Sequence, residues 1–152
     1  VVDYMVEIGG EVRAKGKNQS GRPWTIGVST PDPNAQSNDL IAQFMVDGSV
    51  ATSGNYRNYY EFQGQKFGHT LDPKTGFPAV TNMLSATVFH PSCAIADAYA
   101  TGFMSMGYEK AIHFVSKIDD IEYLFIYADE NNLLKKVNSS GVYDMMKTTS
   151  EN

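Results

Sequence analysis

The sequence predicts an α+β protein with a largely antiparallel sheet and two helices late in the chain. Three observations support this. The first 90 residues contain many short β-prone runs, each bounded by Gly, Pro, Asn or Asp. Residues 93–106 are rich in Ala and Met and contain no Pro, which favours a helix. A strongly apolar run at 121–128 then predicts one more strand.

The first half of the chain is read as strands. Residues 3–8 and 11–15 are expected to pair across Gly9-Gly10, a good hairpin turn. Residues 24–29 alternate apolar and polar side chains, which predicts the next strand. We expect 40–46 and 49–53 to pair with each other, turning at Asp47-Gly48.

The segments around residue 60 continue this pattern. Residues 55–62 are rich in aromatic side chains and β-prone, and Gly64 is expected to turn the chain back through Lys66 and Phe67. Residues 84–89 predict another strand, which His90-Pro91 ends.

The helices are predicted after this point. Ser92 is a suitable N-cap for helix 93–106, and Gly107 is expected to end it. Apolar residues at helical spacing predict a second helix over 108–117. A last hairpin arm is expected at 133–137, and the polar tail after Met146 is expected to fray.

Composition limits the function classes. With 152 residues and 42% hydrophobic content, the chain suits one globular domain. A net charge of −5 and a pI of about 5.1 argue against a nucleic-acid partner and against a basic membrane-binding face. The single cysteine, Cys93, excludes an internal disulfide and leaves the redox compartment open. These residues contain no apolar run of transmembrane length, and none of them is expected to form a signal peptide. Because the chain opens directly as a strand without an initiator Met, we expect a piece of a longer chain.

The segment from Gly68 to Pro78, sequence GHTLDPKTGFP, concentrates reactive side chains between residues that fix the backbone. Pro73, Gly76 and Pro78 exclude a helix or a central strand, and Asp72-Pro73 favours a turn. Rigid loops of this kind often hold functional residues. The alternative is a polar hairpin connection with an incidental histidine.

From His69 to Pro78 the sequence resembles the His-x-x-Asp-Pro-x-Thr-Gly-x-Pro signature of the ApbE family, which are FAD:protein FMN transferases. The resemblance implies a T-fold-like α+β fold and makes residues 1–152 the C-terminal portion of a single domain. The upstream portion, which holds another metal ligand and much of the flavin and adenine site, would precede Val1. The rest of the site would come from that missing half or from a second chain.

Asp97 and Thr101 are four residues apart in the predicted helix, so both oxygens face the same side. Such oxygens suit Mg²⁺. The segment is otherwise apolar, so Asp97 is expected to be buried and to need a partner or a metal. A cap or a salt bridge is the alternative. Ala-Asp-Ala-x-x-Thr also resembles the metal-binding helix of the family, where a further acidic ligand can occupy the position of Ala100. That position carries no carboxylate here.

Two further segments resemble ApbE elements. Glu7, Gly9 and Gly10 match the Gly-Gly hairpin of the family, which implies close approach of backbone to a ligand, although a simple tight turn also explains the pair. The stretch 52–56 resembles a strand-to-loop element near the active site. It makes Ser53 and Asn55 candidate flavin-binding residues, and Tyr56, Tyr59 or Tyr60 could stack on a ring unless they are simply packed.

The resemblance assigns the chemistry. His69 would act as the base that takes the proton of a Ser or Thr hydroxyl on a target protein, a task that suits the ordinary histidine pKa of about 6.5. Asp72 would orient the loop or the histidine. Leu71 is expected to contact FAD through its backbone, and Thr75 belongs to the same cofactor-binding motif. Mg²⁺ at Asp97 and Thr101 would offset charge on the leaving phosphate. His90 and His113 are expected to be structural.

Three functions follow. The first is Mg²⁺-dependent transfer of FMN from FAD to a protein Ser or Thr, with release of AMP. The second is hydrolysis of FAD to FMN and AMP on the same scaffold. The third is a flavin-binding module without turnover. The partners expected are FAD, an acceptor flavoprotein and the missing half or a second chain. The resemblance also implies a periplasmic, lipid-anchored parent protein.

Overall fold

The computed structural model describes residues 1–31, 39–55, 59–62 and 65–147. Within these ranges the strands are β1 (Tyr4–Ile8), β2 (Glu11–Lys15), β3 (Trp24–Ser29), β4 (Leu40–Val46), β5 (Gly48–Gly54), β6 (Tyr59–Phe62), β7 (Gln65–Gly68), β8 (Met83–His90), β9 (Glu122–Ala128) and β10 (Leu134–Asn138). The helices are α1 (Cys93–Met106), α2 (Tyr108–Val115) and α3 (Ser140–Lys147). These bounds confirm the predicted strands and the first two helices to within a few residues. Of the segment 55–64, residues 56–58 and 63–64 lie outside the described residues.

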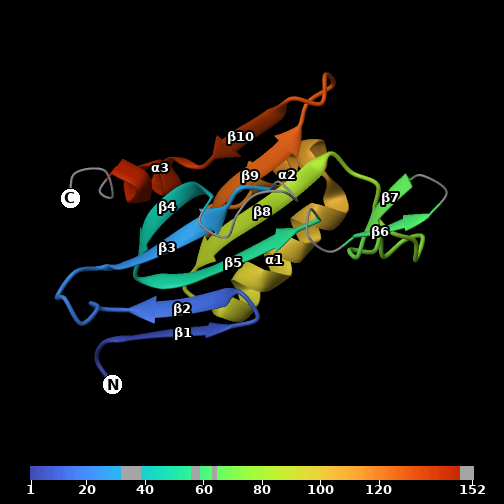
Figure 1. Cartoon of the computed structure of the whole chain (residues 1–152). Coiled ribbons are helices and arrows are strands. Elements are labelled where there is room, and N and C mark those ends of the chain that lie inside the picture. The colour runs from blue at the N-terminus through green and yellow to red at the C-terminus, as the bar shows by residue number, and fades with distance from the viewer. Residues whose placement is uncertain (32–38, 56–58, 63–64, 148–152) are drawn as a thin grey trace.

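A six-stranded antiparallel sheet forms the centre of the molecule, in the order β1-β2-β5-β8-β9-β10. The hairpins β3–β4 and β6–β7 are separate two-stranded sheets. Figure 1 shows α1 along one side of the large sheet and the β6–β7 hairpin extending beyond it. The prediction of an α+β fold with a largely antiparallel sheet is confirmed.

Each face of the large sheet buries its own apolar cluster. On one face, Ala51, Val88 and Phe125 pack with α1 and α2. On the other face, Val50 and Phe89 pack with the β3–β4 hairpin and α3. Consecutive residues of β5 therefore serve opposite clusters, because side chains alternate across a strand. This alternation decides which cluster each polar residue of β5 adjoins.

The helix α1 is fixed to the sheet by aromatic rings. Phe103 is fully buried and stacks on Tyr99 at 5.7 Å between centroids, while its ring meets Phe125 of β9 edge-on at 5.0 Å. Such contacts add to the burial energy of the rings. The helix is therefore held firmly, and its exposed face has a defined position.

The predicted pairing of 40–46 with 49–53 is wrong. The strand β4 pairs with β3, whereas β5 pairs with β2 and β8. The reason is burial: Ser49, Val50 and Ala51 are each at most 3% exposed, so both faces of β5 are covered. A strand of this kind needs a neighbour on each edge, and the chain changes sheets at Asp47-Gly48 instead of making a hairpin.

Both predicted helices are present, and the structure adds a third, α3, which was not predicted. Its apolar residues Val142, Met145 and Met146 have helical spacing, and Val142 is fully buried against the β3–β4 side. The tail expected to fray after Met146 begins with Lys147, the last residue of α3, and residues 148–152 lie outside the described residues.

The start of α1 differs in one detail from the prediction. Ser92 occupies the N-cap position, but its side chain makes no capping hydrogen bond. Its backbone N–H instead donates to Nδ1 of His90 at 2.8 Å, which gives His90 a structural contact. In the part of the chain that is described, no helix has both the length and the apolar character needed to cross a membrane.

Candidate functional site

The segment 69–78, which we call the signature loop, is a tight hairpin. Leu71 and Pro78 form a bridge at its neck, and the Asp72 N–H donates to the Phe77 carbonyl at 2.9 Å. The Gly76 N–H returns to the Asp72 carbonyl at 2.8 Å, with Gly76 at a φ of 72°, a conformation that favours glycine. The loop is exposed yet rigid, because its backbone groups are paired within it.

The side chains of Asp72 and Thr75 are used inside this loop. Asp72 Oδ1 accepts the Lys74 N–H at 2.8 Å, and Thr75 Oγ1 accepts the Phe77 N–H at 3.3 Å. Both are turn contacts of the kind short polar side chains make. Of the two expected roles for Asp72, these contacts favour orienting the loop.

Two neighbouring contacts anchor the beginning of the loop to the end of β5. Thr70 is buried, its hydroxyl donates to Asn55 Oδ1 at 3.3 Å, and its carbonyl accepts the Ala79 N–H at 2.9 Å. A Cβ added to Gly68 would lie 2.7 Å from Asn55 Cγ, so Gly68 permits this close packing. His69 lies between these two fixed residues and is exposed to solvent.

The polar face of α1 lies beside the same loop. Asp97, Thr101 and Ser105 follow one another at four-residue spacing and therefore share a face of the helix. Thr101 Oγ1 and Ser53 Oγ are 3.2 Å apart, and Ser105 Oγ donates to the Leu71 carbonyl at 3.2 Å. The structure thus brings together Ser53, Thr101 and the signature loop.

The expectation that Asp97 is buried is wrong, because its side chain is exposed. The core side of the helix is its opposite face, where Ala96, Ala100 and Phe103 are buried. Burial therefore gives no reason for a metal at Asp97. Ala100 is fully buried and offers no side-chain oxygen, so this position contributes nothing to a metal site.

The donor set on α1 nevertheless fits Mg²⁺ in its chemistry. Mg²⁺ takes oxygen ligands and commonly uses one or two carboxylates, with waters and substrate phosphates completing its shell. Asp97 and Thr101 supply one carboxylate and one hydroxyl on an exposed face. No group of three or more His, Cys, Asp or Glu side chains suited to a metal exists among the described residues. The chain therefore offers part of a metal site.

The Gly-Gly hairpin lines a cavity of about 370 Å³ on the other side of β5. Glu7, Gly9 and Gly10 lie there with Thr52 and Gly54 of β5 and with residues of β3. Gly9 and Gly10 both have positive φ values, which explains the choice of glycine at the turn. Three predicted cofactor-binding residues are thus brought together, and they meet the same strand end that holds Ser53.

Several polar residues at this strand end were missed by sequence reasoning. On the cavity side, Thr52 and Thr87 share a hydrogen bond of 2.9 Å. The fully buried Ser85 Oγ, opposite Gly54 in the ladder, has no hydrogen-bond partner among the residues that the structure describes. Ser105 had a visible signal, because it continues the four-residue spacing of Asp97 and Thr101. The Thr and Ser residues on the strands had none, since their neighbours depend on strand pairing.

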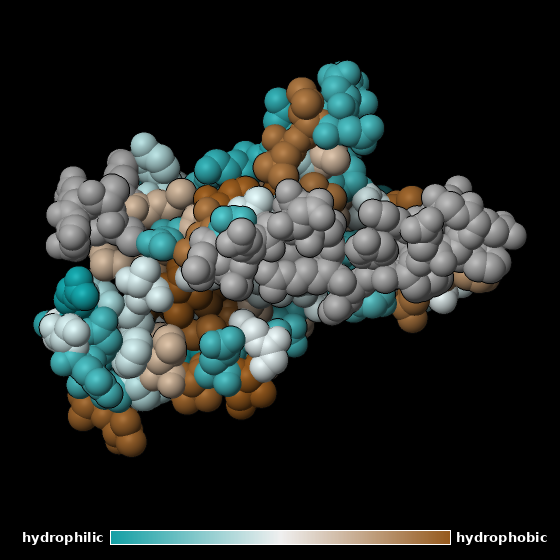
Figure 2. All heavy atoms as spheres, in the orientation of Figure 1, coloured by the Kyte–Doolittle hydropathy of each residue, from teal (hydrophilic) through white to brown (hydrophobic). Residues whose placement is uncertain are grey.

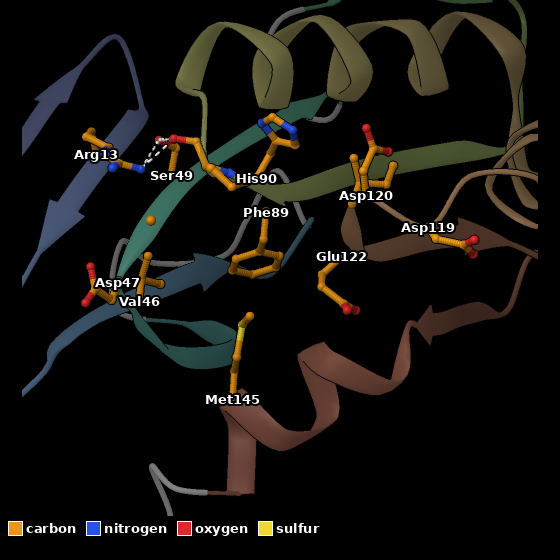
Figure 3. Close-up of a pocket in the computed structure, with 13 residues that line it drawn as sticks. Arg13, Val46, Asp47, Ser49, Phe89, His90, Asp119, Asp120, Glu122 and Met145 are labelled. Carbon is orange, nitrogen blue, oxygen red and sulfur yellow. Dashed lines mark hydrogen bonds between the residues drawn. The ribbon is translucent and has the colours of Figure 1, made fainter.

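Two more cavities are present. The first lies away from the predicted site residues, and the second has one of them, Asp72, in its wall. One of about 290 Å³ opens at the far end of β8, between Arg13, His90, Phe89 and acidic residues that include Glu122; Figure 3 shows it. None of the predicted site residues lines it. Another of about 350 Å³ lies between the loop and the α1–α2 junction, with Asp72, Ser105 and Glu109 in its wall.

Comparisons with known proteins agree with this arrangement. A family model described as the ApbE family matches residues 1–125. The chain is 38% identical over 149 residues to a FAD:protein FMN transferase of Haemophilus influenzae, and 40% identical over 140 residues to one of Vibrio cholerae. These matches cover 98% and 92% of this chain but only 42% and 41% of those proteins.

Solved structures give the same result. The flavin transferase ApbE from Vibrio cholerae matches with a TM-score of 0.77 and 36% identity, over 95% of this chain and 44% of that one. An ApbE protein from Thermotoga maritima matches with a TM-score of 0.74 and 30% identity, over 95% and 45%. The chain thus spans about two fifths of the length of its relatives.

Proposed function

Because the chain belongs to the ApbE family, we propose that it is part of an enzyme that transfers FMN from FAD to a Ser or Thr hydroxyl of a target protein and releases AMP. The observation that supports this most directly is the contact between two distant segments. The loop that holds His69 is bonded to the same face of α1 that presents Asp97 and Thr101. This contact supports the proposal that a base on the loop works beside a phosphate-binding face on α1.

The proposed reaction exchanges one bond to phosphorus for another. The acceptor oxygen forms a bond to the phosphorus of the FMN phosphate, the pyrophosphate bond of FAD breaks, and AMP leaves. The proton of the acceptor hydroxyl passes to a ring nitrogen of His69, which is exposed and so open to an incoming protein. Asp72 holds the loop, and the exposed side of the loop receives the acceptor.

Asp97 and Thr101 would hold Mg²⁺ in this proposal. When bound, Mg²⁺ supplies positive charge that offsets the charge of the pyrophosphate oxygens. Ser53 orients the Thr101 hydroxyl through their 3.2 Å contact. Because one carboxylate and one hydroxyl make only part of a site, we propose that a polypeptide segment corresponding to the remaining length of the relatives, or a second chain, completes it.

The C-terminal end of β5 has one group of predicted residues on each face: α1 and the signature loop on one, the Gly-Gly hairpin on the other. Ser53 faces α1 and the signature loop, whereas Thr52 and Gly54 face the cavity beside Gly9 and Gly10. We propose that FAD extends from one group to the other around this strand end. This arrangement supports an extended dinucleotide as the substrate. We also propose, from family resemblance alone, a periplasmic, lipid-anchored parent protein; cell fractionation would test this.

The deciding experiment uses the full-length protein with FAD, Mg²⁺ and a candidate acceptor, whose intact mass is then measured. We expect the mass to increase by one FMN, and His69→Ala to abolish this increase while FAD binding, followed by flavin fluorescence, is nearly unchanged. His113→Ala is the matched control, because His113 is exposed on α2 and outside the site.

The other outcomes separate the remaining functions. Full transfer by His69→Ala would remove histidine as the base. AMP release without any gain in acceptor mass would indicate FAD hydrolysis or a wrong acceptor. Flavin binding with neither product would indicate a binding module. Peptide mapping of the modified acceptor would show whether the linkage is to Ser or Thr.

A further inference from the structure

The polar face of α1 extends one turn beyond the two candidate metal ligands, to Ser105. Ser105 Oγ donates to the Leu71 carbonyl at 3.2 Å, so a side chain of this helix holds the backbone of the signature loop. We propose that Ser105 is a positioning residue that sets the place of His69 relative to the Asp97–Thr101 face. This inference rests on the proposed function and concerns how the same site is assembled.

The position of Leu71 explains why this bond matters. Leu71 forms the neck of the hairpin with Pro78 and is two residues from His69. Its side chain is 55% exposed, so packing contributes little to holding it. Its carbonyl bond to Ser105 therefore determines how the neck sits against α1. A shift of the neck would carry His69 away from the pyrophosphate, and misplacement by about 1 Å can slow a reaction by roughly 10²-fold.

The other hydrogen bonds that anchor this segment have different partners. Thr70 is tied to Asn55 at the end of β5 and not to the helix. Thr81, beyond the loop, donates to the Met104 carbonyl at 3.2 Å and so fixes the exit of the loop to the backbone of α1. Ser105 and Thr81 thus each tie one side of the loop to the same end of α1 by a single hydroxyl. Ser105 alone of the two belongs to the face that includes Asp97 and Thr101.

Because Ser105 and Thr81 each anchor one side of the loop through one hydroxyl, their variants can be compared directly in the full-length protein. Ser105→Ala removes the hydroxyl at the neck, Ser105→Thr keeps it, and Thr81→Val removes the hydroxyl at the exit with little change of shape. We expect Ser105→Ala to lower kcat for FMN transfer by about three- to tenfold, the value of one such hydrogen bond. KM for the acceptor and the half-saturating Mg²⁺ concentration should stay within about twofold, because Asp97 and the loop side chains that face the acceptor are themselves unchanged.

Thr81→Val should lower thermal stability at least as much as Ser105→Ala, since its bond is the more buried of the two, yet leave kcat within about twofold; Ser105→Thr should restore kcat. Equal loss of kcat in Ser105→Ala and Thr81→Val would overturn the inference, since the bond would then act only through stability. Unchanged kcat in Ser105→Ala, or failure of a folded Ser105→Thr to recover, would overturn it as well.

A second measurement distinguishes this inference from the proposed function. If the wild-type protein transfers no FMN, the proposed function fails, but hydrogen exchange still tests the anchor. Ser105→Ala should then raise exchange at the amides of Asp72 and Gly76, which are bonded within the loop, more than Thr81→Val does. Equal exchange in the two variants would show that Ser105 does not hold the neck.

Discussion

The side chains around His69 act mainly on backbone groups. Asp72 and Thr75 accept loop amides, and Ser105 donates to a loop carbonyl. Their residue types follow from this use, because short polar side chains reach nearby backbone without spanning a gap. Substituting them changes the shape of the loop. Removing His69 or Asp97 instead removes a group proposed to act on the reactants.

At this scale, the carboxylate of Asp97 is expected to set the metal requirement. Asp97→Ala should raise the Mg²⁺ concentration needed for half-maximal FMN transfer by an order of magnitude or more, since one of few oxygen ligands is lost. A Mg²⁺ titration of activity measures this. Asp120→Ala is the control, an exposed carboxylate beside the distant cavity. An unchanged titration in Asp97→Ala would refute the metal assignment.

At the scale of elements, the chain uses hairpin turns closed by single side chains. In the turn between β9 and β10, Asp129 Oδ1 accepts the N–H groups of Asn131 and Leu133, each at 2.9 Å, and Lys135 Nζ lies 3.6 Å from Oδ2. The Leu133 bond, then the Asn131 bond and the Lys135 charge, lower the pKa of Asp129. The turn therefore favours the ionised carboxylate.

The sign of the pH dependence follows. A carboxylate whose folded pKa is lowered stabilises the fold at pH values above its unfolded pKa, and this stabilisation is lost as the pH falls through the folded pKa. Asp129→Asn keeps an acceptor but cannot titrate. We expect the Tm advantage of wild type over Asp129→Asn to shrink from neutral pH to about pH 3. Glu130→Gln, at a neighbouring exposed acid, is the control. A difference in Tm that does not vary with pH would contradict this.

Across the whole molecule, the two outer strands of the large sheet differ in the charge of their side chains. β10 carries Lys135 and Lys136, and charged side chains discourage pairing with another chain. β1 at the opposite edge exposes Met5, Val6 and Ile8, with Ile8 at 75%. Figure 2 shows apolar atoms along the lower rim, where Figure 1 places β1. Among the described strands, none pairs with the outer edge of β1.

These 152 residues, produced alone, are therefore expected to self-associate through β1. Val6→Lys should shift the population toward monomer in light scattering after size exclusion, because a charge at this edge opposes pairing. Lys136→Gln, at the opposite edge, tests whether β10 is protected by charge and should increase association. A chain that is monomeric at all accessible concentrations would contradict the prediction.

Much of this architecture could be predicted from local patterns, and the failures share one cause. Turn residues and spacing located the strands and both earlier helices, and family resemblance located His69 and the α1 face. The pairing of β5, the exposure of Asp97 and the role of Ser105 depend on which segments meet across the sheet. Those contacts join residues far apart in the sequence, so the pattern within a short window of neighbouring residues does not predict them.

The contact between Ser53 and Thr101 also indicates at what stage of synthesis and folding the candidate site forms. The two residues are 48 positions apart, and the Leu71–Ser105 pair is separated by 34. During synthesis the signature loop emerges before α1, and closing such long segments is slow compared with forming a local hairpin. A nascent chain synthesised as far as Pro78 therefore contains His69 but has no helix face beside it. The proposed site therefore forms only after α1 has docked on the sheet.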